Sequence, residues 1–190
     1  MARLNKTQFA ILGLLAIRPR SGYDIKQACD HALRHFWAES YGSIYPILRR
    51  LEAAGFAQRT VSAQVGKPDR HQYAITATGQ AALRDWLAEP VELPSMRNEM
   101  LLKLFLGPRG EPAALLANLA RVRADHEAKL LEYRVLEREV RELYGQSEFF
   151  EYWQLSLDYG RRMARSTIEW CERASETLQA RDRGANHVNP

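Results

Sequence analysis

The residues best suited to chemistry form a short cluster in which two arginines follow small, hydroxyl-bearing and aromatic side chains. Arg49 and Arg50 can neutralise phosphate groups, and the hydroxyls of Ser43 and Tyr45 can hydrogen-bond to a base or a phosphate. Gly42 keeps the footprint small, so that a partner can approach closely. These residue types favour contact with nucleic acid.

A helix over about residues 43–54 would present this cluster. Its apolar residues fall on one face about 100° wide, which must point into the core. The opposite face then carries the arginines and can enter a major groove. Pro46 lies in the first turn if Ser43 is the N-cap, whereas a helix that starts at Ser40 would be kinked there, and the sequence leaves both open. The core-facing residues are Ile44, Ile47, Leu48 and Leu51, and the outer face carries Gly42, Pro46, Arg49, Arg50 and Ala53.

Two short strands follow this helix. Residues 56–64 and 70–75 are rich in β-formers, and the turn residues at 65–69 between them predict a hairpin. Lys67, Arg70 and His71 make its tip cationic. A cationic hairpin of this kind can lie along a phosphate backbone.

The order of the other N-terminal elements indicates a winged helix-turn-helix over residues 1–88. Residues 5–17 and 22–34 have helical apolar patterns, and both precede the arginine-bearing helix. Gly55 suits the position just past that helix, and Thr76 suits the N-cap of the helix that follows the hairpin. Three helices, a hairpin and a closing helix are thus expected.

The second half predicts a helical dimerisation domain over residues 95–180. Pro90 and Pro94 mark a linker at 89–94, a short helix is expected at about 95–106, and long helices at about 112–143 and 148–178. The last helix has a heptad-like seam, and the tail at 181–190 has no periodicity and is expected to be disordered. The predicted seam comprises Phe149, Trp153, Ser156, Gly160, Met163, Thr167, Trp170 and Ala174.

Charge divides between the two halves. Residues 1–88 hold 12 Lys/Arg and 6 Asp/Glu, a net +6, whereas residues 89–190 hold 15 and 17, a net −2. The basic excess favours a polyanion as the partner of the first half. No stretch approaches the ~20 apolar residues of a membrane span, no signal-peptide pattern opens the chain, and two distant cysteines favour a reduced compartment. A cytoplasmic protein with no membrane contact is therefore expected.

A metal site and an apolar ligand site are weighed beside DNA binding. Cys29, His31, His35 and Glu39 form the one metal-like cluster, in which the two histidines have the i,i+4 spacing of some zinc sites. Exposed imidazoles on a helix surface are the plainer interpretation, and no cofactor or metal is expected. Aromatic side chains are candidates for an effector pocket, against simple core or interface packing: Phe36, Trp37, Tyr152, Trp153, Tyr159, Met163 and Trp170.

No catalytic constellation is visible. The sequence lacks a Gly-rich phosphate loop, a nucleophile elbow and paired carboxylates suited to a cleft. The alternating charges at 137–142 indicate a solvated helix surface. The chain is therefore not expected to be an enzyme. Two rivals to DNA binding by the winged helix stay open: a metal sensor that uses Cys29, His31 and His35, and a winged helix used for protein–protein assembly.

Several motifs resemble the PadR family of bacterial transcriptional regulators. They are Gly22-Tyr-Asp-Ile25, Gly42-Ser-Ile-Tyr-Pro-Ile-Leu-Arg-Arg-Leu-Glu52, Lys67-Pro-Asp-Arg70 and Tyr73-Ala-Ile-Thr-Ala-Thr-Gly79. This resemblance covers about residues 5–88. The second half, including Asn98-Glu-Met-Leu-Leu-Lys-Leu-Phe105, resembles the longer-tailed branch whose helical tail is related to virulence activators.

The resemblance implies a homodimer that represses a nearby promoter and releases DNA when a small effector, often phenolic or aromatic, binds. A two-fold dimer requires a roughly palindromic site with half-site centres about 34–36 Å apart, or a multiple of that distance. The resemblance and the residue patterns together give one set of expected DNA contacts: Tyr23, Tyr41, Gly42, Ser43, Tyr45, Pro46, Arg49, Arg50, Lys67, Arg70 and His71.

Overall fold

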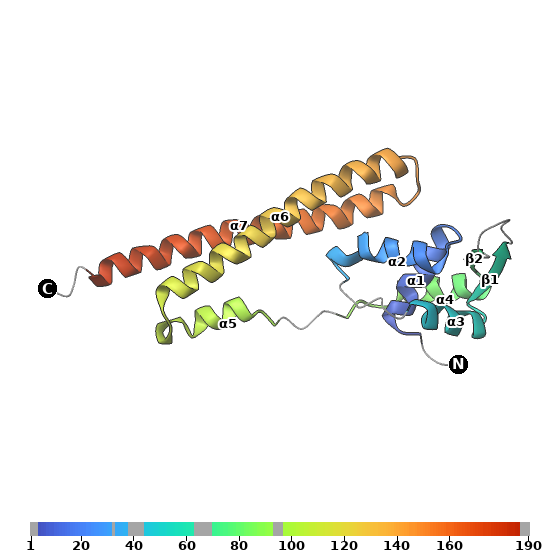
Figure 1. The fold of residues 1–190 in the computed structure, drawn as a ribbon, viewed down its shortest axis with the longest axis horizontal. Coiled ribbons are helices and arrows are strands. Elements are labelled where there is room, and N and C mark those ends of the chain that lie inside the picture. The colour runs from blue at the N-terminus through green and yellow to red at the C-terminus, as the bar shows by residue number, and fades with distance from the viewer. Residues whose placement is uncertain (1–3, 32, 38–43, 63–69, 93–96, 187–190) are drawn as a thin grey trace. The chain divides into compact units, whose positions relative to one another are not determined.

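The computed structural model describes residues 4–31, 33–37, 44–62, 70–92 and 97–186. Contacts divide the chain into two compact units, Met1–Leu93 and Pro94–Pro190, which we call the N-terminal and C-terminal units. Figure 1 labels their helices and strands. None of the helices in the described ranges is long and apolar enough to cross a membrane.

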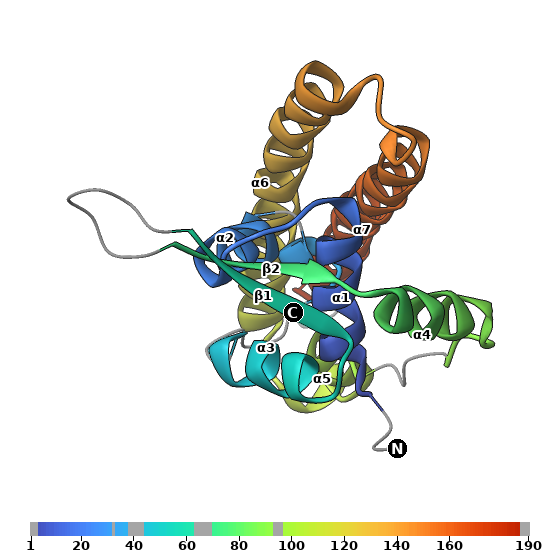
Figure 2. The same ribbon diagram turned by 90° about the vertical axis from the view of Figure 1, so that its right-hand side faces the viewer.

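The N-terminal unit has the element order of a winged helix-turn-helix, as predicted. In chain order the elements are α1 (Lys6–Ile17), α2 (Gly22–His31), η1 (Leu33–His35), α3 (Ile44–Ala53), β1 (Ala57–Ser62), β2 (Arg70–Ile75) and α4 (Ala77–Ala88). β1 and β2 pair antiparallel, with Ala57 opposite Ile75 and Ser62 opposite Arg70. Figure 2 shows the two strands side by side.

Local sequence signals define several ends of these helices. The Asn5 side chain accepts a hydrogen bond from Gln8 N, and the Gln8 side chain accepts one from Asn5 N, so the two residues form a capping box for α1. Thr76 caps α4, as predicted, by accepting a hydrogen bond from Gly79 N. Gly55 has φ +77° just past α3, a conformation that favours glycine.

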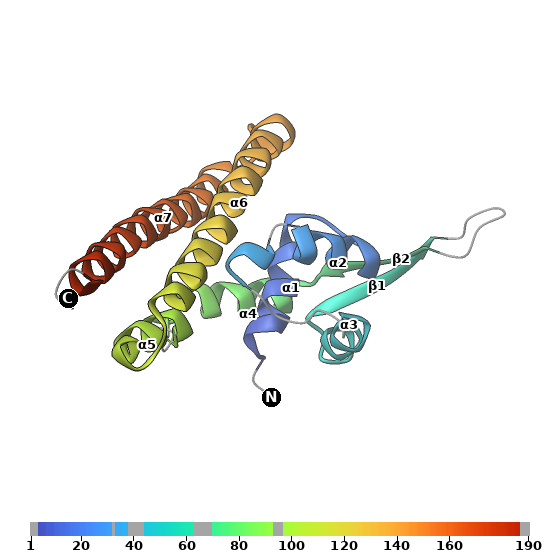
Figure 3. The same cartoon turned by 60° about the vertical axis from the view of Figure 1, so that its left-hand side comes forward.

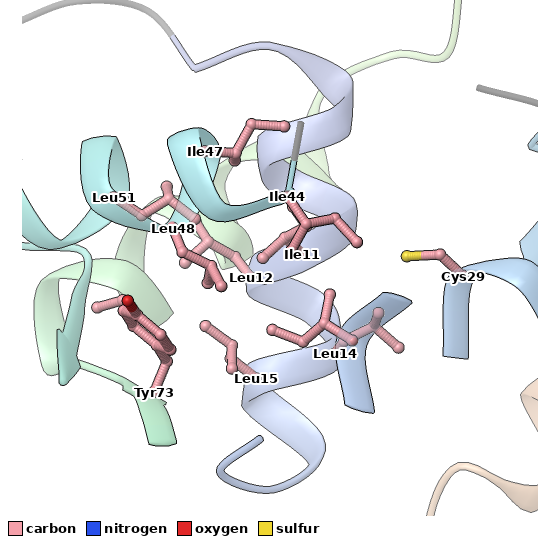
Figure 4. Packing of buried hydrophobic residues seen from close by; sticks show 12 residues of the cluster. Ile11, Leu12, Leu14, Leu15, Cys29, Ile44, Ile47, Leu48, Leu51 and Tyr73 are labelled. Carbon is pink, nitrogen blue, oxygen red and sulfur yellow. The ribbon is translucent and has the colours of Figure 1, made fainter. Parts of the chain in front are cut away.

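One apolar cluster holds the N-terminal unit together. Its members come from α1, α2, α3 and both strands, and Figure 4 shows side chains of α3 meeting those of α1. α1 is apolar around most of its circumference, which suits its position: it contacts α2, α4 and β2, and its buried side chains share a cluster with those of α3. The fully buried members include Ile11, Leu12, Ile25, Cys29, Leu48 and Leu51.

The C-terminal unit consists of a short helix and a long helical hairpin. Its elements are α5 (Glu99–Phe105), η3 (Gly107–Arg109), α6 (Pro112–Tyr144) and α7 (Phe150–Asn186). Figure 3 shows α6 and α7 running side by side in opposite directions. Pro112 lies in the first turn of α6, where its missing N–H leaves no bond unmade.

One detail of the predicted second half is wrong. α7 continues through residues 181–186, which were expected to be disordered, while 187–190 lie outside the described residues. Within the predicted seam, Ser156 and Met163 are exposed in the single chain, and their packing against a second chain stays a prediction. The face of α7 that packs against α6 runs through the half-buried Gly160, which belongs to the predicted seam, and through the buried Ala164 and Cys171, which do not. Apolar residues at alternating spacings of three and four form two adjacent stripes here, and only the packing of α6 decides which one is buried.

Candidate nucleic-acid interface

The exposed face of α3 carries the residues predicted to contact DNA. Ile44, Ile47, Leu48 and Leu51 are buried, as predicted, and this anchoring fixes which side of the helix faces solvent. The solvent side presents four candidate contacts, Tyr45, Pro46, Arg49 and Arg50, and all four are exposed. α3 begins at Ile44, so Pro46 lies in its first turn. The helix therefore offers two guanidinium groups, a phenol and a smooth proline surface to a partner.

The arginines of this face are available for an external anion. Within the described ranges, neither Arg49 nor Arg50 forms an ion pair with another residue. Behind them, Glu52 lies 3.5 Å from Nε of Arg59 on β1, which ties α3 to the hairpin. A guanidinium that has no carboxylate partner can bind a phosphate without first breaking an internal pair.

α2 sets the position of Tyr45. Gly22, at the start of α2, is buried, and a Cβ built there would lie 2.6 Å from Cε1 of Tyr45. Any larger residue would displace the Tyr45 ring, so Gly22 allows α2 and α3 to approach closely. The Ser21 hydroxyl donates to Asp24 and accepts from Asp24 N, which fixes the start of α2. Tyr23 is exposed on the same helix and accepts a hydrogen bond from Gln27.

Arg20 joins the hairpin to the helices, a role that sequence reasoning did not assign. Its backbone exchanges two hydrogen bonds with Tyr73 on β2, of 3.0 and 2.8 Å. Its buried side chain donates from Nε to the carbonyl oxygen of Leu14 at 3.2 Å. Arg20 thus acts as a third, one-residue strand of the wing. A buried arginine of this kind has no local sequence signature, because Tyr73 is distant in the chain and only folding brings it to Arg20.

The wing contributes His71 from β2, whose side chain is exposed opposite Val61 on β1. Lys67, Tyr41, Gly42 and Ser43 lie outside the described residues. Arg70 is the first residue of β2, and its side chain also lies outside what is described. Of the residues expected to contact DNA, the structure describes the side chains of Tyr23, Tyr45, Pro46, Arg49, Arg50 and His71, and all six are exposed.

The aromatic candidates for an effector pocket do not form one cluster. Phe36 and Trp37 belong to the N-terminal unit, where Trp37 packs on the core and Phe36 is exposed. In the C-terminal unit, Trp153 stacks on Phe149 and meets the edge of Tyr144, while Trp170 packs beside Leu119 and Cys171. The other three lie on the outer surface of α7: Tyr152, Tyr159 and Met163.

The predicted metal-like cluster is not assembled among the described residues. Cys29 is fully buried in the apolar cluster, while His31 is exposed and Glu39 lies outside the described residues. Among the described side chains, no group of three or more His, Cys, Asp and Glu residues could hold a metal ion. Cys29 therefore serves as a small core residue in this unit.

The chain is similar in sequence to known transcriptional regulators. Residues 11–85 match the PadR-like family of transcriptional regulators, and residues 96–179 match the C-terminal domain of virulence activators. A probable transcriptional regulator of Mycobacterium tuberculosis is 30% identical over 184 residues, which cover 90% of this chain and 96% of that protein. The negative transcriptional regulator PadR of Bacillus subtilis is 34% identical over 99 residues, 52% of this chain and 54% of PadR.

Solved structures share the fold. Bacillus subtilis PadR in complex with operator DNA superposes with a TM-score of 0.80 at 24% identity, covering 92% of this chain and 99% of that one. The same protein in complex with p-coumaric acid gives a TM-score of 0.72 at 25% identity, covering 90% and 98%. The resemblance expected from the sequence motifs is thus confirmed in both halves of the chain.

Proposed function

Because the chain belongs to the PadR-like family of transcriptional regulators, we propose that it binds operator DNA as a homodimer and represses transcription until a small molecule releases it. The exposed face of α3 carries this proposal. Arg49 and Arg50 are exposed beside Tyr45, on a helix whose other face is anchored in the core. A helix held in this way can present its side chains to a major groove without changing its own conformation.

The hairpin and α2 would complete the DNA contacts. His71 on β2 and Tyr23 on α2 are exposed, and Lys67 and Arg70 belong to the same wing in the sequence. The wing would lie along the phosphate backbone while α3 reads base edges. Two copies related by a two-fold axis would then bind a roughly palindromic operator.

Repression and release by an effector are supported by the relatives. The Bacillus subtilis relative is a negative transcriptional regulator, and its fold has been determined with p-coumaric acid bound. Apolar pockets lined by aromatic side chains bind planar phenolic acids well. Because the seven candidates named above are dispersed, we propose Trp153 and Trp170, which pack inside the C-terminal unit, as the starting points for the effector site. The effector would favour a state in which the two reading helices no longer match the half-sites. This action would take place in the cytoplasm and requires no catalytic step.

A binding titration tests the proposal. The full chain is titrated into a fluorescent duplex that covers the region upstream of its own gene, at several salt concentrations. We expect specific binding whose logarithm falls linearly with the logarithm of salt concentration, because bound phosphates release counterions. p-Coumaric acid is then added as the effector probe, and release of the duplex is measured.

A shuffled duplex of the same length is the control. Equal affinity for the native and shuffled duplexes would contradict sequence-specific binding. If the protein binds neither duplex at any salt concentration, the result would favour the protein–protein assembly role instead. Binding that p-coumaric acid leaves unchanged would remove this phenolic acid as effector without affecting the proposal of DNA binding.

A further inference from the structure

The side chain of Tyr45 on α3 lies against the backbone of Gly22 on α2. A Cβ built on Gly22 would lie 2.6 Å from Cε1, 3.0 Å from Cζ and 3.1 Å from Cδ1 of the Tyr45 ring. All three distances are shorter than the separation of about 3.5–4 Å that two carbon atoms prefer in van der Waals contact. The outer edge of the ring therefore occupies the space that a side chain at position 22 would need.

The start of α2 holds Gly22 in place. Gly22 is buried, and the residues around it are fixed by hydrogen bonds. Ser21 N donates to the carboxylate of Asp24 at 3.0 Å, and Asp24 N donates to the hydroxyl of Ser21 at 3.1 Å. Just before them, the backbone of Arg20 pairs with that of Tyr73 on β2. The backbone at Gly22 cannot move away from the ring without disturbing these bonds.

The Tyr45 ring is free to move, although the helix that carries it is not. Ile44 and Leu48, which Figure 4 shows in the buried cluster, are 2% and 0% exposed, so the backbone of α3 is anchored. Tyr45 itself is 56% exposed, and its ring can turn to another staggered rotamer toward solvent. A larger residue at position 22 would therefore displace the ring and leave both helices where they are.

The orientation of this ring matters for the exposed face of α3. Tyr45 lies in the first turn of the helix, next to Pro46 and on the solvent side that also carries Arg49. The N-terminal residues of a recognition helix are the ones that reach base edges in a major groove. A phenol that already rests against a backbone surface loses less side-chain entropy when DNA binds.

We propose that Gly22 is a positioning residue for operator recognition, and that its lack of a side chain holds Tyr45 in the orientation that DNA binding uses. Gly22 acts through the Tyr45 ring and not through a DNA contact of its own. The inference rests on the proposed function, because it requires α3 to read an operator. Gly79 provides the contrast: a Cβ there would overlap the carbonyl oxygen of Phe56, a backbone atom, so Gly79 serves the fold itself.

A double-mutant cycle on the full chain tests the proposal. Wild type, Gly22→Ala, Tyr45→Ala and the double variant are titrated into the fluorescent upstream duplex, and binding is measured by anisotropy. Each single variant should weaken binding by about tenfold, because displacing the phenol and removing it abolish the same contact. Adding Gly22→Ala to Tyr45→Ala should cost less than about 2-fold more, since no ring remains to be displaced. The slope of the salt dependence should not change, because no charge is lost.

Gly13→Ala is the matched control for the cycle. It makes the same substitution inside α1, where no atom lies within 4 Å of the Cβ position, and should leave the affinity within about 2-fold of wild type. The proposal is overturned if Gly22→Ala leaves the affinity unchanged. It is also overturned if Gly22→Ala costs the same factor with and without the Tyr45 ring.

Spectra of isotope-labelled tyrosine rings, recorded without DNA, test the displacement itself. Tyr45→Ala and Tyr152→Phe identify two of the ring signals. Gly22→Ala should shift the signal of Tyr45 and leave that of Tyr152, on α7, in place. An unshifted Tyr45 signal overturns the positioning role, whatever the protein binds. If the Tyr45 signal shifts but the wild type binds no duplex, the proposed operator binding fails and Gly22 has no part in recognition, so the two failures are distinguishable.

Discussion

The two units bury their apolar residues to different degrees. In the N-terminal unit, helices from several directions and a hairpin close one cluster of twelve buried residues. In the C-terminal unit the described cluster has four buried residues, and large apolar side chains remain exposed on α5, α6 and α7. A helical hairpin can cover only one face of each of its helices. The N-terminal unit thus closes a larger buried cluster than the C-terminal unit does.

The comparison also separates two kinds of recognition. In the N-terminal unit the exposed face of α3 is polar and cationic, and the core behind it holds that face in place. In the C-terminal unit, exposed large apolar side chains on α5, α6 and α7 lie among exposed charged residues of both signs. The first surface suits a polyanion and the second suits another protein surface.

The largest loss of stability is expected from a cavity in the buried cluster of the N-terminal unit. Leu48→Ala removes a fully buried side chain from α3 and should lower the free energy of unfolding by about 2–5 kcal/mol, because the cavity cannot collapse fully. Leu131→Ala makes the same change on the exposed side of α6 and should alter the free energy of unfolding by no more than about 0.5 kcal/mol. Urea unfolding followed by circular dichroism measures both. Similar losses for the two variants would contradict the contrast between the units.

Replacing a glycine by alanine should change the free energy of unfolding in opposite directions in the two units. A Cβ at Gly160 would lie 2.5 Å from Cζ of Tyr133, which is buried between α6 and α7, so Gly160→Ala should destabilise the chain by about 1–3 kcal/mol. Gly13, inside α1, has no atom within 4 Å of its Cβ position. Gly13→Ala should therefore stabilise the chain by about 0.5–1 kcal/mol, since alanine is the better helix former. Calorimetric melting temperatures that move in the same direction for both would refute this assignment.

The arginine face of α3 should matter for DNA and not for stability. Arg49→Ala should weaken operator binding about tenfold and reduce the steepness of its salt dependence by about 0.9 for each phosphate that is no longer neutralised. Arg138→Ala removes an exposed arginine from α6 and serves as the control. Fluorescence anisotropy at several salt concentrations measures both variants. An unchanged salt slope for Arg49→Ala would show that Arg49 contacts no phosphate.

The sequence predicted the helices and the exposed face of α3 because local spacing determines them. The four apolar residues of α3 leave one possible inner face. The inner face of α7 could not be chosen in the same way, because two apolar stripes of equal quality run along it and the position of α6 decides between them. Arg20 and Gly22 were missed as positioning residues because their partners, Tyr73, Leu14 and Tyr45, are brought to them only by folding.

The smallest predicted effect is a pH dependence of stability that comes from a histidine in the helical pair of α6 and α7. His126 lies on α6, and its Nδ1 is buried with no hydrogen-bond partner among the described residues. Burial lowers the pKa of His126, Lys129 lowers it further, and Asp125 opposes them. The folded state therefore holds a proton on this imidazole less readily than the unfolded chain does.

The direction of the pH dependence follows from that difference. Above the ordinary histidine pKa of about 6.5 both states are neutral at this position, and the histidine has no effect on stability. As the pH falls below about 6.5, the unfolded state takes up the proton first, so the free energy of unfolding decreases until the folded state is protonated too. His126→Gln should flatten this part of the stability profile, and Lys129→Gln should flatten it partly. Urea unfolding between about pH 7.5 and about pH 5.5 measures the difference, and parallel profiles for wild type and His126→Gln would contradict it.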